Sequence, residues 1–192
     1  AVLAELGGLV RPGSLVISIA AGITTSAIEG LVPAGVSVVR AMPNTPARVD
    51  RSVTGVSAAA GCTAASLALG VRLLESVGAV VEVPESLQNA VTAVSGSGPA
   101  YVFFLAEAMI AAAEDLGLDP ATAQRMVHHT ILGAATLLES SGETAQTLRR
   151  NVTSPNGTTA AAISTMEELG VHQAVVAAIA AAHDRSRELS GG

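Results

Sequence analysis

The sequence predicts an α/β domain followed by an all-α domain. As far as Pro84, short apolar runs of strand length alternate with helical segments, which is typical of βαβ units and a doubly wound sheet. Beyond Pro84, helical segments follow one another without a convincing strand. Hydrophobic residues make up 49% of the chain but aromatic residues only 2%, so small aliphatic side chains must fill the core. These observations place the domain boundary near Leu87 and give domains at residues 1–86 and 87–192.

The first domain begins with residues 1–9, whose apolar spacing resembles the tail of a helix. Strands are predicted at residues 15–20, 36–40, 53–60 and 80–83. Helices are predicted between them at residues 25–31 and 64–77. Thr24 or Thr25 can cap the first helix and Thr63 the second, and Gly78 lies just past the end of the second.

The second domain starts with the most apolar helix, predicted at residues 99–116. Ser95 or Ser97 can cap it after a glycine-serine turn, and Pro99 suits a first helical turn. Between residues 101 and 113 only Glu107 is charged, so this helix should lie inside a bundle or an interlocked dimer. A run of 13 residues is too short to cross a bilayer, so no membrane contact is expected. Further helices are predicted at residues 120–139, 144–150 and 159–183 or beyond, the last divided at Gly170.

The composition excludes several classes of function. The net charge is −6 and the chain has no lysine, which argues against nucleic-acid binding. Cys62 is the single cysteine, so an intrachain disulfide and a cysteine-built zinc site are excluded. The histidines lack an i+4 partner for a metal, and no metal site is expected. No signal peptide is recognisable, and we expect a cytoplasmic protein.

Two loops are rich in residues that bind ligands. NVTSPNGTT, residues 151–159, precedes a predicted helix, where unpaired N–H groups and hydroxyls make an anion site. The same residues also suit an ordinary capping loop. MPNTP, residues 42–46, can equally be a simple turn. The glycine fingerprint GxGxxG of nucleotide-binding domains does not occur, and the first residues look like the middle of such a domain.

Three motifs in this order and spacing resemble 1-pyrroline-5-carboxylate reductases. They are VRAMPNTP (residues 39–46), AVTAVSGSGPAYVFFLAEAM (residues 90–109) and NVTSPNGTT (residues 151–159), and the resemblance extends from about Leu15 to Leu189. It implies an α/β Rossmann-type NAD(P)-binding domain at residues 1–86, without the part that carries the fingerprint. It also implies an all-α helical dimerisation and substrate-binding domain at residues 87–192, and a homodimer or larger ring.

The resemblance also implies a reaction, the last step of proline biosynthesis. Pyrroline-5-carboxylate would be reduced to L-proline with hydride from NADPH or NADH. Thr159 would be the catalytic residue, a hydrogen-bond partner and proton donor for the ring nitrogen. The substrate-binding residues would be Glu85, Thr92, Ser154, Gly157, Thr158 and Thr159, with N–H groups of the last three and the Ser154 hydroxyl on the carboxylate. The cofactor would contact Ile19, Ala20, Ala21, Met42, Pro43, Asn44 and Asn151.

Two positions depart from the pattern of that family. Asn156 stands where glycine is usual, and asparagine tolerates the left-handed backbone better than other residues with a side chain. Asn89 stands where an acidic residue is common, and we assign it no role from the sequence. The absent fingerprint leaves open a non-catalytic helical dimerisation or binding module descended from the same family. A third alternative, a dehydrogenase of the hydroxyacid or 6-phosphogluconate kind, needs a catalytic lysine that this chain lacks.

Overall fold

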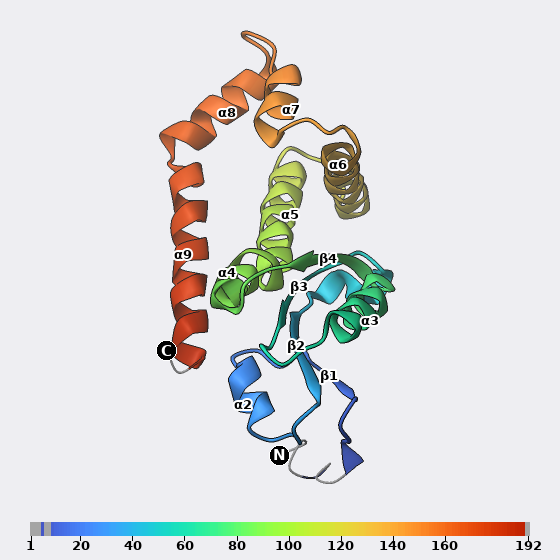
Figure 1. Cartoon of the computed structure of the whole chain (residues 1–192). Helices are drawn as coiled ribbons and strands as arrows, with labels where there is room; N and C mark the ends of the chain where they lie inside the picture. The colour runs from blue at the N-terminus through green and yellow to red at the C-terminus, as the bar shows by residue number, and fades with distance from the viewer. Residues whose placement is uncertain (1–4, 6–8, 191–192) are drawn as a thin grey trace. The chain divides into compact units, whose positions relative to one another are not determined.

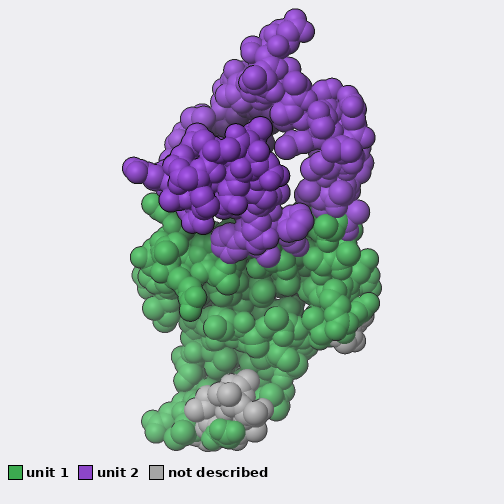
Figure 2. Space-filling view, turned by 180° about the vertical axis from the view of Figure 1, so that it is seen from behind, with its two compact units in different colours: residues 1–99, 178–192 green, residues 100–177 purple. Residues whose placement is uncertain are grey.

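The computed structural model describes Glu5 and residues 9–190 (Figure 1). The helix predicted for residues 1–9 therefore falls almost entirely outside the described residues. The chain forms two compact units (Figure 2). Unit 1 comprises Ala1–Pro99 and Ala178–Gly192, and unit 2 comprises Ala100–Ala177. The division into domains at residue 86 stays a prediction.

Unit 1 contains a four-stranded sheet in the order β1-β2-β3-β4. The strands are β1 (Leu15–Ser18), β2 (Ser37–Met42), β3 (Ser52–Ala58) and β4 (Gly78–Glu82). β1 pairs with β2 and β3 with β4 in parallel, but β2 and β3 are antiparallel. This pair departs from strict βαβ alternation because residues 43–51, with one short 3₁₀ helix (Thr45–Val49), are too few for a crossover.

Helices cover both faces of the sheet, as the predicted α/β class requires. Val38 packs with Ile28 of α2 (Thr25–Glu29), whereas its neighbour Val39 faces a cluster that includes Leu67 of α3 (Ala64–Glu75). Neighbouring residues of a strand point to opposite faces, so each face has its own small core. Thr24 caps α2, since its hydroxyl accepts the N–H of Ala27 at 3.2 Å.

α3 begins in the same way. The Thr63 hydroxyl accepts the N–H of Ser66 at 3.1 Å, which confirms the predicted cap.

The predicted turn before the apolar helix is wrong. α4 (Gln88–Val91) leads through a π-helical turn (Thr92–Gly96) into α5 (Gly98–Asp115), and neither Ser95 nor Ser97 caps a helix. The N–H of Ser97 instead donates to the carbonyl of Thr92 at 2.9 Å. Pro99 has no N–H for the carbonyl of Ser95, and the Asn44 side chain donates to that carbonyl at 3.2 Å. A contact from a distant loop thus keeps the chain helical here.

This continuous helical stretch is also longer than predicted. Glu85–Asp115 spans 31 residues and is long and apolar enough to cross a membrane by length and composition. The argument that the segment is too short for a bilayer is therefore wrong. Core helices of oligomers have the same composition, so the stretch alone does not indicate a membrane.

Unit 2 is built from helices, and beyond Pro84 the described residues contain no strand. α5 is followed by α6 (Pro120–Ser140), α7 (Ala145–Asn151), α8 (Thr158–Glu168) and α9 (Val171–Leu189), whose last residues belong to unit 1. Asp119 caps α6 by accepting the N–H groups of Ala121 and Thr122 at 3.1 Å. Gly170, with φ +70°, separates α8 from α9 as predicted.

Unit 2 buries very little within one chain. Of its described residues only Ala123 and Val127 are buried, while Phe104 of α5 is 74% exposed and Leu169 is 75% exposed. Of the two predicted settings for α5, a bundle within the chain and an interlocked dimer, the exposure of α5 in the single chain contradicts the first and leaves the second. Apolar surface of this extent marks an interface with another protein chain. The fold therefore requires a partner over these helices.

Candidate active site

The loop at residues 152–157 joins α7 to α8 and is held by hydrogen bonds to backbone carbonyl groups of α7 and of the loop itself. The hydroxyl of Thr153 donates to the carbonyl of Arg149 at 2.6 Å and ends α7. The N–H of Gly157 donates to the carbonyl of Ser154 at 3.0 Å and closes a turn. Within that turn Asn156 has φ +61°, which confirms that asparagine takes the left-handed conformation here.

Gly157 is needed because the Ser154 hydroxyl approaches it closely. A Cβ atom on Gly157 would lie 2.5 Å from Ser154 Oγ and 3.2 Å from the Ser154 carbonyl oxygen. The φ of Gly157 is −83°, which any residue adopts, so a side chain here would meet no backbone strain and would instead displace the Ser154 hydroxyl. The glycine thus lets the Ser154 hydroxyl lie at the beginning of α8.

The first turn of α8 offers free donors for an anion. Gly157 is the N-cap and supplies no side-chain acceptor, and the first turn has no acidic residue. The N–H groups of Thr158 and Thr159 precede the first intrahelical bond, from Ala161 to Gly157 at 3.1 Å. They point out of the positive end of the helix dipole, where a carboxylate is stabilised. The Gly157 N–H, predicted as a third donor, is already bonded to Ser154.

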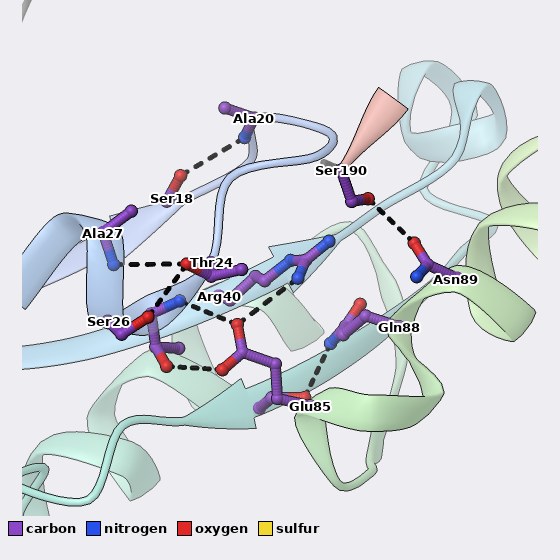
Figure 3. Close-up of polar contacts among 12 residues, drawn as sticks. Ser18, Ala20, Thr24, Ser26, Ala27, Arg40, Glu85, Gln88, Asn89 and Ser190 are labelled. Carbon is purple, nitrogen blue, oxygen red and sulfur yellow. Dashed lines mark hydrogen bonds and ion pairs between the residues drawn. The ribbon is translucent and has the colours of Figure 1, made fainter. Parts of the chain in front are cut away.

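Glu85 lies in unit 1 and is engaged by two other elements of the chain (Figure 3). Its carboxylate accepts the N–H of Thr25 at 2.7 Å and the Thr25 hydroxyl at 2.5 Å, and Arg40 Nη1 lies 3.3 Å away. Burial raises the pKa of Glu85, but the hydrogen bonds from Thr25 and Arg40 outweigh it, and the pKa lies below its ordinary value. The carboxylate is therefore ionised at neutral pH and ties α2 to β2.

Thr92 and Asn44 also have partners within unit 1. The Thr92 hydroxyl donates to the carbonyl of Gln88 at 2.8 Å. The Asn44 side chain accepts the N–H of Val53 at 3.2 Å and donates to the carbonyl and hydroxyl oxygens of Ser95. The predicted contact of Thr92 with the substrate and that of Asn44 with the cofactor stay predictions. Both the oxygen and the nitrogen of the Asn44 amide are already hydrogen-bonded within unit 1.

The loop after β1, unlike Thr92 and Asn44, is open to solvent. β1 ends at Ser18, so Ile19 and Ala20 belong to this loop and not to the strand as predicted. Ile19 is 65% exposed, and Ala20 and Ala21 are exposed as well. Small or apolar residues open to solvent at the carboxyl end of a parallel strand suit a flat cofactor ring. These residues fit the predicted nicotinamide cofactor.

The predicted site residues fall into the two compact units. Unit 1 holds Ile19, Ala20, Ala21, Met42, Pro43, Asn44, Glu85 and Thr92, and unit 2 holds Asn151, Ser154, Gly157, Thr158 and Thr159. Among the residues that the structure describes, no group of three His, Cys, Asp or Glu side chains could hold a metal ion. Each compact unit therefore orders its own share of the predicted site residues.

Sequence reasoning missed the partners of Glu85. From the sequence, Thr25 is only a candidate cap for α2, and Arg40 is only the end of a strand. Arg40 is 5% exposed. A charged residue at the end of an otherwise apolar strand requires a counter-charge when it is buried, and this signal could have identified it. It could not have identified Glu85 as the counter-charge, since the two residues lie 45 positions apart.

Comparison with known proteins identifies the family. The family described as pyrroline-5-carboxylate reductase dimerisation matches residues 85–189. A pyrroline-5-carboxylate reductase from Corynebacterium melassecola is 44% identical over 191 residues, with 98% of this chain and 71% of the relative covered. The relative of that name from Pseudomonas aeruginosa is 44% identical, and 99% of this chain and 70% of the relative are covered. The chain thus spans most of the length of these relatives.

Solved structures agree. A pyrroline-5-carboxylate reductase from Coxiella burnetii has a TM-score of 0.93 and 39% identity, covering 98% of this chain and 71% of that one. The pyrroline carboxylate reductase of Plasmodium falciparum, solved with NADP bound, has a TM-score of 0.89 and 28% identity, covering 98% and 76%. The motifs, the fold and these comparisons all lead to one assignment. The chain belongs to the pyrroline-5-carboxylate reductase family.

Proposed function

We propose that this chain reduces 1-pyrroline-5-carboxylate to L-proline with hydride from NADPH or NADH. The observation that carries the proposal is the loop at residues 152–157, which brings the Ser154 hydroxyl to the uncapped beginning of α8. In a chain of this family, that combination of hydroxyl and backbone donors suits the substrate carboxylate. The proposal makes the chain an oxidoreductase of amino-acid biosynthesis.

The carboxylate-side residues bind and orient the substrate. The N–H groups of Thr158 and Thr159 and the Ser154 hydroxyl hold the carboxylate, and several such bonds fix the position of the ring. Thr159 is half-buried, and we assign its hydroxyl to the imine nitrogen as hydrogen-bond partner and proton donor. The carbon–nitrogen double bond takes up one proton at nitrogen and one hydride at carbon, which yields the cyclic amine.

The cofactor-side residues accept the nicotinamide nucleotide. The exposed residues Ile19, Ala20 and Ala21 hold it at the carboxyl end of β1, and Met42 and Pro43 of the same unit flank it. When bound, the cofactor supplies the hydride. The chain itself has little further chemistry to perform, because a protonated imine is already a good electrophile and positioning provides most of the rate.

The apolar helices of unit 2 supply the interface with a second copy. The region matched by the dimerisation family, residues 85–189, contains α5 and its exposed phenylalanines. A homodimer, or a larger ring built from dimers, covers these side chains. Since the long apolar stretch belongs to this interface, we assign it no membrane span, and the single cysteine suits the reducing cytoplasm in which we place the protein.

The test is turnover by the complete gene product with pyrroline-5-carboxylate and NADPH. We expect proline formation that falls by at least about tenfold in kcat/KM for Thr159→Ala, because that variant loses a hydrogen bond to the reacting ring. A folded dimer that forms no proline would refute the proposal and favour the non-catalytic dimerisation module. Activity on a hydroxyacid instead would favour the third class, which the absence of lysine already disfavours.

A further inference from the structure

The end of α9 packs against the cofactor-side loop. A Cβ atom on Gly22, the residue after Ala21, would lie 3.0 Å from the carbonyl oxygen of Leu189 and 3.7 Å from the Cα atom of Ser190. Gly22 also has φ +77°, which disfavours any side chain. The loop and the last turn of α9 are thus in backbone contact at a position that only glycine fits.

Asn89 of α4 holds this last turn from another side. Its Oδ1 atom accepts the hydroxyl of Ser186 at 2.9 Å and lies 3.1 Å from the hydroxyl of Ser190 (Figure 3). The Ser190 hydroxyl is also 2.7 Å from the carbonyl of Ser186. All these residues are half-buried and lie in unit 1. The Ser190 hydroxyl has one hydrogen, so its donation is divided between Asn89 Oδ1 and the Ser186 carbonyl, whereas the Ser186 hydroxyl donates to Asn89 Oδ1. Asn89 thus anchors the last turn of α9, a role that its sequence position did not indicate.

The loop has little support of its own. Its exposed residues make few packing contacts, and the bond from the Ala20 N–H to the Ser18 hydroxyl is long, at 3.4 Å. A loop that binds a ligand must be ordered before or during binding, and ordering it in advance improves affinity. The last turn of α9, held by Asn89, provides a backbone contact at the point where the loop turns back towards α2.

We propose that the last turn of α9 positions the cofactor-binding loop, and that Asn89, Ser186 and Ser190 are positioning residues for cofactor affinity. The inference rests on the proposed function, which assigns residues 19–21 to the cofactor. It extends that function to side chains that touch neither ligand. The predicted consequence is specific: weakening the anchor lowers affinity for NADPH and leaves the carboxylate-side loop in unit 2 unaffected.

The first experiment compares Asn89→Leu with Asn89→Asp in the complete gene product. Leucine has a similar size but no acceptor, whereas aspartate retains an oxygen for both hydroxyls. We expect Asn89→Leu to raise the Kd for NADPH about tenfold, as loss of a buried hydrogen-bond acceptor implies. The KM for pyrroline-5-carboxylate at saturating NADPH should stay unchanged, and Asn89→Asp should bind NADPH as the wild type does. Ser164→Ala, which removes an exposed hydroxyl bonded to Glu168 in α8, is the matched control.

A second measurement tests the anchor without cofactor. Hydrogen exchange of the amides at residues 19–23 should accelerate in Asn89→Leu and in the Ser186→Ala/Ser190→Ala double variant, and not in Asn89→Asp. Unchanged exchange, or faster exchange with an unchanged Kd for NADPH, would overturn the inference, as would a lower melting temperature alone. A wild type that binds no NADPH would refute the proposed function instead, and the two failures are therefore distinguishable.

Discussion

The close approach of Ser154 to Gly157 allows a prediction about substrate affinity. In Gly157→Ala the new methyl carbon would lie 2.5 Å from Ser154 Oγ, and non-bonded atoms do not approach so closely. The hydroxyl is the far end of a short side chain, so it rotates away and the backbone keeps its path. We therefore expect Gly157→Ala to remove the Ser154 hydroxyl from the carboxylate site without removing the residue.

The magnitude follows from the bond that is lost. A hydrogen bond to a charged group contributes about 1.5–3 kcal/mol, which corresponds to about 10- to 150-fold in kcat/KM. Ser154→Ala and Gly157→Ala should each show a loss in this range. In the double variant the atoms of residue 154 nearest to the new methyl carbon are the carbonyl oxygen at 3.2 Å and Cβ at 3.7 Å, so the methyl group is accommodated once that carbonyl shifts by a few tenths of an ångström. The double variant should therefore be no worse than Ser154→Ala alone.

The assay is a double-mutant cycle on kcat/KM for pyrroline-5-carboxylate, followed by NADPH consumption, with melting temperatures measured alongside. Alanine is a poorer N-cap than glycine, which lowers the free energy of unfolding by about 1 kcal/mol or less in either background. If Gly157→Ala lowers kcat/KM by the same factor in the wild type and in Ser154→Ala, its effect does not depend on the Ser154 hydroxyl. An unchanged kcat/KM in Ser154→Ala would refute its role on the carboxylate.

Three further predictions concern other parts of the molecule. Thr159→Ser should keep most of the kcat that Thr159→Ala loses, because it retains the hydroxyl; equal kcat values for the two variants would contradict a role for that group. Because the pKa of Glu85 is lower in the folded state, its carboxylate stabilises the fold above its ordinary pKa of 4.5, and this contribution disappears as the pH falls through the folded-state value. Glu85→Gln should accordingly lose about 1–2 kcal/mol of unfolding free energy at pH 7, and chemical denaturation should show the difference from wild type shrinking in acid; a constant difference would disprove this. Phe104→Glu should abolish the dimer, since a charge would replace a large apolar side chain of the proposed interface, and light scattering that still reports the wild-type mass would place the interface elsewhere.

Much of the fold could be read from patterns a few residues long. Thr24, Thr63 and Asp119 each accept an N–H two or three positions further on, and such caps depend only on neighbouring residues. Gly170 ends a helix by its own conformation, and alternation of apolar residues marks the strands. These features follow from local geometry, so the starts of α2, α3 and α6 were predicted well, and their ends to within about two residues.

The errors arose where distant residues decide the local conformation. The stretch around Ser95 and Pro99 has the composition of a turn, yet the side chain of Asn44 receives the carbonyl that Pro99 cannot bond, and the chain remains helical. The antiparallel pairing of β2 with β3 is an error of another kind: the observed strands extend further towards each other than predicted, and the loop left between them is too short for a crossover. α5 is exposed in the single chain, and its apolar pattern, which allowed a bundle or an interlocked dimer, could not say which of the two covers it.

The motifs of this chain identify its family. They also locate the loop at residues 152–157, which we assign to the substrate carboxylate, because the residues of each motif lie together in the sequence. The tertiary structure decides which of the remaining polar groups are free to bind ligands. Glu85 meets Thr25 across 60 residues and Asn89 meets Ser186 across 97, and both side chains are engaged within the chain. Partners at such separations are set by the packing of the whole unit, since no local preference links them. The sequence therefore points to the reaction, whereas the folded chain shows that the last turn of α9 lies against Asn89 and the loop after β1.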